Sequence, residues 1–363
     1  MSCPLPNHLS LQFARFQNCT ETTPMAGKKI ICVIGATGNQ GGSVARRFLQ
    51  DPRFTVRAIT RDPASAKAQG LKVLGAEVVQ AELDDVATLE VAFQGANVIF
   101  SVTQYWEPFF RPDCRAKAAE LGISCRRYAY DVEYRQGKNI ADAAASVVST
   151  LDDNGFLVST LSHANKSSGG AFTELYHFDA KADVFPGYVA DKYPALAAKM
   201  SCIHTGYFMT SYQILPGSYF NKQSDGSYQM RFATAEDRPV PHLDVTSDTG
   251  NFVYAVSQMP PGKDYMAAGS TVGFGEYIKL WGKATGVPVS YKQVTFEEQV
   301  ADSGDPDLGV EVTHMFVYSD SPGYDGGMNL ITAEDLRKAG IDCPMTSLEE
   351  WISKQDWSGI LAQ

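Results

Sequence analysis

Glycines recur at a fixed spacing directly after the first apolar run of the sequence. Gly35, Gly38 and Gly41 follow the run 30–34 and lead into a helical pattern over 43–50. Glycines in such a turn let the chain bend out of a strand, approach a pyrophosphate closely and pack the next helix against the strand. The free N–H groups at the start of that helix bind phosphate. This context predicts a dinucleotide site that includes Gly35, Thr37, Gly38, Asn39, Gln40 and Gly41.

The end of the next apolar run, 54–59, bears on which dinucleotide is bound. Sites for NAD(H) usually carry an acidic residue there, which binds the ribose 2′-hydroxyl. This sequence continues instead with Thr60 and Arg61, and Asp62 comes only after them. A guanidinium forms charge-assisted hydrogen bonds with a 2′-phosphate. We therefore expect NADP(H), and Asp62 keeps NAD(H) as the less favoured alternative.

These residues need a scaffold, and short apolar runs alternate with helical patterns through the first half of the chain. Runs of strand length lie at 30–34, 54–59, 77–80, 96–102, 156–160 and 201–205, and helical patterns at 43–50, 63–70, 86–94 and 139–151. Such alternation forms βαβ units and a parallel sheet. The expected fold class is α/β: a Rossmann-type doubly wound parallel sheet with a smaller C-terminal α/β substrate domain.

Three parts of the chain are expected. Residues 1–26 lack the basic start and apolar centre of a secretory signal, and we interpret them as a disordered or non-native N-terminal extension. Residues 27–206 are expected to form the NAD(P)-binding Rossmann domain, with part of 240–268 returning to it. Residues 207–363, with many aromatic side chains and Gly and Pro turns, are expected to form a substrate-binding subdomain.

Composition argues against several kinds of partner. The net charge of −10, without a basic cluster, is unsuited to direct nucleic-acid binding. No apolar run approaches the roughly 18–20 residues of a membrane span. The seven cysteines form no CxxC pair, which is typical of a reduced, cytoplasmic protein. The six histidines lack metal-ligand spacing, so no metal site is expected.

Several motifs, taken in order, resemble the NmrA-like family, an atypical branch of the short-chain dehydrogenase/reductases. They lie at 35–43, 56–62, 102–107 and 136–139, and Tyr176–Lys181 adds to the match. The resemblance is strongest to fungal members and extends from about residue 28 to the C-terminus. It implies a Rossmann domain, NADP(H) binding, and one of two roles: an oxidoreductase, often in secondary metabolism, or a non-catalytic redox-sensing regulator that binds transcription factors.

The resemblance also assigns cofactor contacts by position. Glu82 and Leu83 are expected near the adenine, and Val102 and Thr103 beside the cofactor after the fourth strand. Lys181 is expected near the nicotinamide ribose. Lys138, in the motif 136–139, completes the expected set of cofactor contacts.

Short-chain dehydrogenases use a helical Tyr-x-x-x-Lys, in which the lysine cation lowers the pKa of a phenol that exchanges a proton with the substrate. Here His177 precedes Lys181 by four residues, so histidine stands where tyrosine is expected. Tyr176, one position earlier, does not share the helix face of Lys181. His177 is either an acid–base group, a role that an imidazole can fill, or a hydrogen-bonded structural residue.

Serine, tyrosine and acidic side chains elsewhere in the sequence are further candidates for proton transfer. Ser159 and Ser162 follow the fifth strand, where the catalytic serine of the wider family falls, and either supply a catalytic hydroxyl or bond loop backbone. Tyr130 and Asp131 belong to an acidic and phenolic group that also contains Tyr128, Glu133 and Tyr134. That group lies either at a pocket mouth or at the amphipathic start of a helix. The catalytic candidates are Lys181, His177, Ser159, Tyr130 and Asp131.

Aromatic side chains follow the fourth and sixth strands, at the sheet edge where α/β proteins bind ligands. They form either a substrate pocket or a subdomain core. The pocket candidates are Tyr105, Trp106, Tyr207, Phe208 and Tyr212.

The function we expect is oxidoreduction of a small aromatic or heterocyclic metabolite with NADP(H), in fungal secondary metabolism. Two alternatives stay open. One is a non-catalytic NADP(H)-sensing transcriptional regulator with a protein partner. The other is a non-redox enzyme on the same fold that catalyses ring closure, an alternative motivated by the missing tyrosine.

Overall fold

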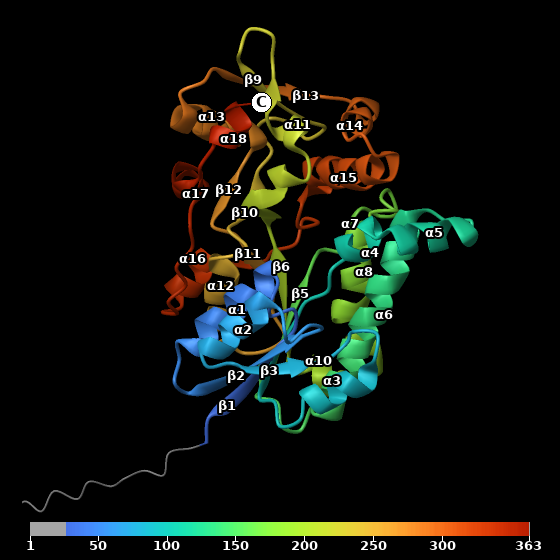
Figure 1. Cartoon of the computed structure of the whole chain (residues 1–363), viewed down its shortest axis with the longest axis vertical. Coiled ribbons are helices and arrows are strands. Elements are labelled where there is room, and N and C mark those ends of the chain that lie inside the picture. The colour runs from blue at the N-terminus through green and yellow to red at the C-terminus, as the bar shows by residue number, and fades with distance from the viewer. Residues whose placement is uncertain (1–26, 363) are drawn as a thin grey trace, which may run out of the picture.

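The computed structural model describes residues 27–362, so the predicted extension over residues 1–26 lies outside the described part. An eight-stranded sheet runs through the lower half of the molecule (Figure 1). All of its neighbouring strands pair in parallel. In spatial order its strands are β14 (Ile331–Thr332), β11 (Asp264–Ala267), β6 (Met200–Thr205), β5 (Phe156–Thr160), β4 (Val98–Ser101), β1 (Lys29–Val33), β2 (Phe54–Thr60) and β3 (Glu77–Gln80).

Helices cover both faces of this sheet (Figure 1). The first strand shows why: Ile31 and Val33 pack into the core on one face, and Cys32 and Ile34 into the core on the other. One face is covered by α1 (Asn39–Leu49), α2 (Ala66–Val73), α12 (Asp248–Val256) and α16 (Ala333–Lys338). The opposite face is covered by α3 (Val86–Ala92), α6 (Cys125–Ser146), α9 (Val189–Lys192) and α10 (Pro194–Ala197). The expected doubly wound α/β fold is confirmed.

The six expected strands are present, each within two residues of its predicted start. The expected helix over 139–151 differs, because α6 begins at Cys125 and ends at Ser146. Ser124 caps the start of α6 by accepting a hydrogen bond from the backbone N–H of Arg127. The first half of α6 was not predicted because charged side chains over 126–138 interrupt the apolar pattern of a helix. After residue 206 the chain returns to the sheet twice. The range 240–268 contains α12 and β11, whereas β14 and α16 lie beyond it.

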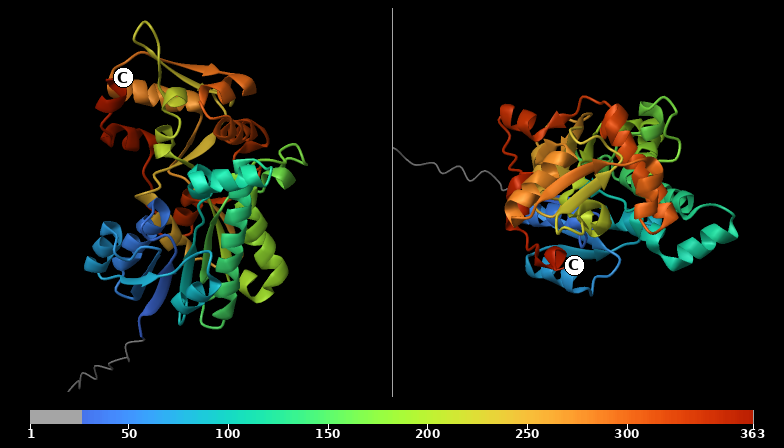
Figure 2. Two further views of the ribbon diagram at one scale, coloured as in Figure 1. Left: turned by 45° about the vertical axis from the view of Figure 1, so that its right-hand side comes forward. Right: turned by 90° about the horizontal axis from the view of Figure 1, so that it is seen from above.

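Most of the other elements after residue 206 form a smaller region above the carboxyl ends of the large sheet (Figure 2). It contains two three-stranded sheets, made of β12 (Ser270–Val272), β10 (Val240–Leu243) and β7 (Tyr207–Phe208), and of β13 (Val289–Gln293), β9 (Tyr228–Phe232) and β8 (Asn221–Lys222). Its helices are α11 (Pro216–Tyr219), α13 (Phe274–Thr285), α14 (Phe296–Asp302), α15 (Pro306–Tyr318), α17 (Leu348–Lys354) and α18 (Ser358–Leu361).

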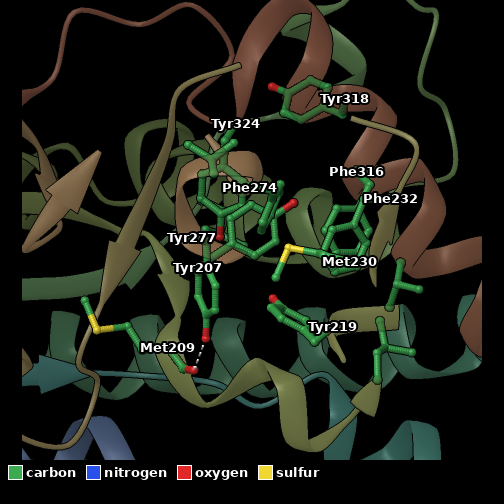
Figure 3. Close-up of a cluster of buried hydrophobic side chains, with 14 of the residues drawn as sticks. Tyr207, Met209, Tyr219, Met230, Phe232, Phe274, Tyr277, Phe316, Tyr318 and Tyr324 are labelled. Atoms are coloured by element: carbon green, nitrogen blue, oxygen red, sulfur yellow. Dashed lines mark hydrogen bonds between the residues drawn. The ribbon is translucent and has the colours of Figure 1, made fainter. Parts of the chain in front are cut away.

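Aromatic rings fill the core of this smaller region (Figure 3). Phe232 and Phe316 stack with their centroids 4.1 Å apart, and Tyr207 lies 4.5 Å from Tyr324. Aromatic pairs of this kind add stability beyond the area that they bury. Many of the aromatic residues after position 206 therefore hold the region together.

We predict that Gly250→Ala destabilises the protein, since α12 packs directly on α1 at this glycine. A Cβ there would lie 2.3 Å from the backbone oxygen of Ser43. Overpacking of this kind costs about 1–3 kcal/mol of unfolding free energy, which urea denaturation measures. Gly70→Ala is the matched control: Gly70 lies in exposed helix α2 with nothing within 4 Å of its added Cβ, so we expect a gain of about 0.5–1 kcal/mol.

Candidate dinucleotide and substrate site

A cavity of about 290 Å³ opens at the carboxyl ends of β1, β2 and β4. The structure brings most of the predicted cofactor residues to its wall: Gly35, Thr37, Gly38, Asn39, Gln40, Gly41, Arg61, Glu82, Leu83, Val102 and Thr103. Ligands of doubly wound proteins bind at this edge of the sheet. We name this space the dinucleotide cavity.

The glycine turn gives the cavity its phosphate-binding character. Gly35 has a φ of +61°, which favours glycine, and a Cβ on Gly41 would lie 2.3 Å from the backbone oxygen of Gly35. The close approach of α1 to β1 therefore requires the third glycine. Gly38 caps α1 without a side-chain hydrogen bond, so the first N–H groups of α1 are left for a ligand. Gln40 Oε1 is buried here with no partner among the described residues.

Lys138 is not at this cavity, in contrast to the prediction. Its ammonium lies over the rings of Tyr188 and Tyr134, at 4.8 Å and 5.7 Å from the centroids. Gln136 lines the cavity instead. Residues two apart on a helix point about 200° apart, so only one of the pair can face the cofactor side.

A second, smaller cavity of about 130 Å³ adjoins the first and is here named the substrate cavity. Gln40, Thr103, Gln104 and Phe208 line both, so the two spaces share a wall. Of the predicted pocket residues, Trp106, Tyr207 and Phe208 line the substrate cavity. Other lining side chains are Leu161, His177, Lys181, Leu215, Tyr219, Val312, Met315, Phe316 and Tyr324.

Tyr105 and Tyr212 do not line it, and their predicted role is corrected. Tyr105 is fully buried, and its hydroxyl donates to the backbone oxygen of Arg126 at 3.0 Å. Tyr212 packs among Phe220 and Trp357, with ring centroids 5.6 Å and 5.3 Å away. Tyr105 is a core residue and Tyr212 is a partly buried residue that packs against the core, an alternative that the aromatic pattern alone could not exclude.

Lys181, on α8 (Tyr176–Ala182), reaches the substrate cavity and forms an ion pair with buried Glu133 on α6. The same Glu133 oxygen accepts the hydroxyl of Thr103 at 2.7 Å. Its other oxygen is buried without a partner among the described residues. A lysine from the expected catalytic helix, a carboxylate and a cofactor-side threonine therefore meet at one point. From the sequence, Glu133 is identifiable only as one member of the acidic and phenolic group.

His177, which replaces the expected tyrosine, also lines the substrate cavity. Its Nδ1 lies 2.7 Å from Glu311 Oε1, and its backbone N–H donates to the same oxygen at 2.8 Å. Arg126 Nε donates to the second Glu311 oxygen at 2.9 Å. Burial would raise the pKa of Glu311, but hydrogen bonding and charge from His177 and the charge of Arg126 hold it below its usual range.

Glu311 and Arg126 were not identified from the sequence. The sequence does contain a signal for Glu311, since it is the one acidic residue between Leu308 and Tyr318 on an otherwise largely apolar helix. An isolated acid in such a stretch indicates a buried, paired charge.

The remaining catalytic candidates lie away from both cavities. Tyr130 donates its hydroxyl to Asp183 at 2.7 Å; burial and that carboxylate raise the pKa of the phenol well above its usual value. Asp131 is half exposed and pairs with Arg127 on its own helix. Ser159 is buried in β5, and Ser162 bonds the hydroxyl of Tyr318 and the backbone of Tyr324. Tyr176 packs beside Arg126.

His163 fixes the helix that carries Lys181. Its Nδ1 and Nε2 lie 3.0 Å from Asp179 and from Asp183 respectively. The backbone N–H of Lys166 approaches the same Nδ1 only at 3.5 Å, so the shorter ion pair determines the protonation of the ring. Burial alone would lower the pKa of His163, but the two carboxylates outweigh it and raise the pKa to about 9.

Within residues 27–362, no cluster of three or more His, Cys, Asp or Glu side chains is arranged to hold a metal ion. Over the same residues, no helix combines the length and apolar character needed to cross a membrane. The five described cysteines are buried and unpaired.

Comparison with known proteins agrees with this architecture. The model of the NmrA-like family matches residues 27–352. The chain belongs to the NmrA-like family. Relatives of this NmrA-like protein include fungal oxidoreductases. The NmrA-like family domain-containing oxidoreductase cpsB of Aspergillus campestris is 32% identical over 293 residues, covering 74% of this chain and 77% of that protein. The himF oxidoreductase of Aspergillus japonicus is 28% identical over 303 residues, covering 80% and 83%.

Solved structures resemble this NmrA-like protein in fold. The negative transcriptional regulator NmrA matches with a TM-score of 0.64 and 19% identity, covering 90% of this chain and 95% of that one. An NADPH-dependent quinone oxidoreductase from Escherichia coli, solved with NADPH, matches with a TM-score of 0.60 and 21% identity, covering 89% and 98%. The fold is therefore common to a regulator and to reductases.

We predict that His163→Asn removes a pH-dependent part of the stability. The histidine pKa is raised from 6.5 to about 9 by folding, so its contribution is complete below pH 6.5 and is lost as the pH rises through 9. Urea denaturation between those pH values should show a steeper loss of unfolding free energy in the wild type than in the variant. His314→Asn is the control, because burial and Arg126 lower the pKa of His314 and remove it from this pH range. Equal slopes in wild type and His163→Asn would contradict the protonated bridge.

Proposed function

We propose that this protein is an NADP(H)-dependent oxidoreductase that acts on a small aromatic or heterocyclic metabolite of fungal secondary metabolism. The observation that carries the proposal is the shared wall between the dinucleotide cavity and the substrate cavity. Because Gln40, Thr103, Gln104 and Phe208 line both cavities, the two spaces adjoin, and a nicotinamide at the junction would lie close to a substrate, as hydride transfer requires.

The dinucleotide cavity fits the proposed cofactor by its shape and its polar groups. The turn leaves no room for a Cβ at Gly41, and the free amides at the start of α1 can donate to a diphosphate. The unpartnered Gln40 Oε1 can accept a hydrogen bond from a ribose hydroxyl. At the end of β2, Arg61 lines the cavity. The Asp62 carboxylate instead accepts the backbone N–H of Ala64 at 2.9 Å, within its own turn. This arrangement favours NADP(H) over NAD(H).

When bound, the nicotinamide supplies or accepts a hydride at C4, and the reacting partner is a C=O, C=N or C=C bond of the substrate. Trp106, Phe316, Tyr207 and Tyr324 offer ring surfaces to a flat substrate. The ammonium of Lys181 lies at the substrate cavity, where it can stabilise negative charge on a substrate heteroatom or donate a proton. Glu133 pairs with that ammonium, and Thr103 donates its hydroxyl to the same Glu133 oxygen.

His177 has a more limited role in this proposal. Its Nδ1 and its backbone both bond Glu311, so the imidazole is fixed in one orientation. Only Nε2 remains on the other side of the ring, 3.4 Å from the sulfur of Met315. We propose that the histidine shapes the cavity and that Lys181 acts on the substrate.

We predict that Gly38→Val abolishes dinucleotide binding and leaves the fold intact. Even a Cβ would approach the Gly35 oxygen to 3.2 Å, and the larger side chain would project over the free amides of α1. Calorimetric titration with NADPH measures the loss, and circular dichroism checks folding. Gly217→Val, with nothing within 4 Å of its added Cβ, should bind NADPH as the wild type does. An unchanged affinity of Gly38→Val for NADPH would show that the phosphates bind elsewhere.

We predict that Lys181→Met reduces turnover by roughly 10²–10⁴-fold, the usual value of positioned acid–base assistance. Because the substitution leaves buried Glu133 unpaired, the double variant Lys181→Met, Glu133→Gln tests whether the loss comes from folding. Lys166→Met, an exposed lysine on α7 (Ala164–Ser167), is the matched control. The measurement follows NADPH absorbance and product together, with a panel of quinones, aromatic aldehydes and cyclic imines.

The same assay separates the proposal from its two alternatives. NADPH consumed in equal amount to product supports oxidoreduction. Product without NADPH consumption would contradict hydride transfer and favour a non-redox ring closure. No product with any compound, together with a protein partner whose affinity changes with NADPH, would favour a regulator.

A further inference from the structure

Two arginines converge on one carboxylate at the rim of the dinucleotide cavity. Glu107 Oε1 lies 3.0 Å from Arg61 Nη1 and 3.7 Å from Arg111 Nη1. All three residues line the cavity. Only Arg61 was predicted as a cofactor residue.

These three side chains come from opposite sides of the cavity. Arg61 directly follows β2, whereas Glu107 lies in α4 (Trp106–Phe110) and Arg111 joins α4 to α5 (Pro112–Glu120). The Arg61–Glu107 ion pair therefore links the segment after β4 to the end of β2. It lies at the point where the ribose 2′ position is expected.

The surroundings of the three side chains single out Glu107. Asp113 also binds Arg111, at 3.0 Å and 2.5 Å, but it is 65% exposed and does not line the cavity. Glu107 is 31% exposed and is the carboxylate between the two guanidinium groups. A carboxylate and a phosphate are alternative partners for the same arginine fork. In this structure Glu107 accepts a hydrogen bond from Arg61 and lies within ion-pair distance of Arg111, whose other guanidinium nitrogens bind Asp113.

We propose that Glu107 is a placeholder for the 2′-phosphate of NADP(H), and that Arg111 binds this phosphate together with Arg61. This inference rests on the proposed NADP(H) binding and adds to it a second arginine and a competing carboxylate. On binding, the phosphate displaces the Glu107 carboxylate, because two anions between the same guanidinium groups repel each other. NADH has no phosphate at this position, so it leaves the Glu107 pairs intact.

Fluorescence titration with NADPH and with NADH tests the assignment in the folded full chain. Glu107→Gln should tighten NADPH binding by roughly two- to fivefold, the size of an exposed ion pair, and leave NADH affinity unchanged. Arg61→Ala should weaken NADPH binding by about tenfold or more, since a charge-assisted bond to phosphate is lost. Arg111→Ala should weaken NADPH by roughly fivefold, and neither substitution should affect NADH.

Asp113→Asn is the matched control. It removes a carboxylate from the same Arg111 but outside the cavity and leaves the Arg61–Glu107 pair in place, so the ratio of NADPH to NADH affinities should change less than in Glu107→Gln. Arg115→Ala is a second control, since Arg115 pairs with Asp305 and does not line the cavity. All of these side chains are partly exposed, and a thermal melt of each variant checks that it folds.

Three outcomes would overturn the inference. A Glu107→Gln variant that loses NADH affinity would make Glu107 an acceptor for the ribose hydroxyl of NAD(H). An unchanged affinity ratio in both Glu107→Gln and Arg111→Ala would remove these residues from cofactor selection while leaving the proposed function in place. Wild-type protein that binds neither dinucleotide would overturn the proposed function itself, and this inference with it.

Discussion

A carboxylate with no exposed surface, Glu311, joins the three helices around the substrate cavity. It belongs to α15, and it accepts hydrogen bonds from Arg126 on α6 and from the backbone and ring of His177 on α8. A charge buried in this way is tolerated only when its partners surround it, and removal of one partner costs several kcal/mol (about 3–5). The position of α15 in the smaller region is thereby tied to the helices of the large sheet.

A second buried carboxylate, Glu133, lies on the same helix as Arg126 and repeats the arrangement on the cofactor side. It joins Thr103, after β4, to Lys181 on α8. On α6, Arg126 and Glu133 lie two turns apart. On α8, His177 and Lys181 lie four residues apart, and they pair with Glu311 and with Glu133 respectively. At position 177, where short-chain dehydrogenases carry a tyrosine, the histidine ring is a hydrogen-bond partner of Glu311.

The fold of the nucleotide half could be predicted from the sequence because its signals are local. The turn 35–41, its strand and its helix are determined by glycine conformation and apolar periodicity, so Gly35, Gly38 and Gly41 could be assigned without the rest of the chain. Arg61 could be placed because it follows a strand whose end faces the cavity. In contrast, the choice between Lys138 and Gln136 depends on how α6 is rotated about its axis. That rotation could not be predicted, because the charged residues before 139 obscured where the helix begins.

The substrate half depended on long-range contacts that no local pattern encodes. Tyr105 and Tyr207 are both buried tyrosines after strands, yet one bonds backbone in a core and the other lines the substrate cavity. Glu311 lies 134 residues from His177, and the pairing follows only from the way α15 packs over α8. Spacing in the sequence cannot distinguish these cases.

The order of strands at one edge of the large sheet has a consequence for how such proteins diversify. Strands β11 and β14 reach this edge from segments that also pass through the smaller region, so the polypeptide crosses between the two regions several times. A cut at a single point would leave β6 with an unpaired, apolar edge, which is prone to association with other chains. The smaller region therefore cannot be exchanged as one continuous segment by a single recombination event, and changes in it must arise as substitutions and loop changes within the segments that cross between the two regions.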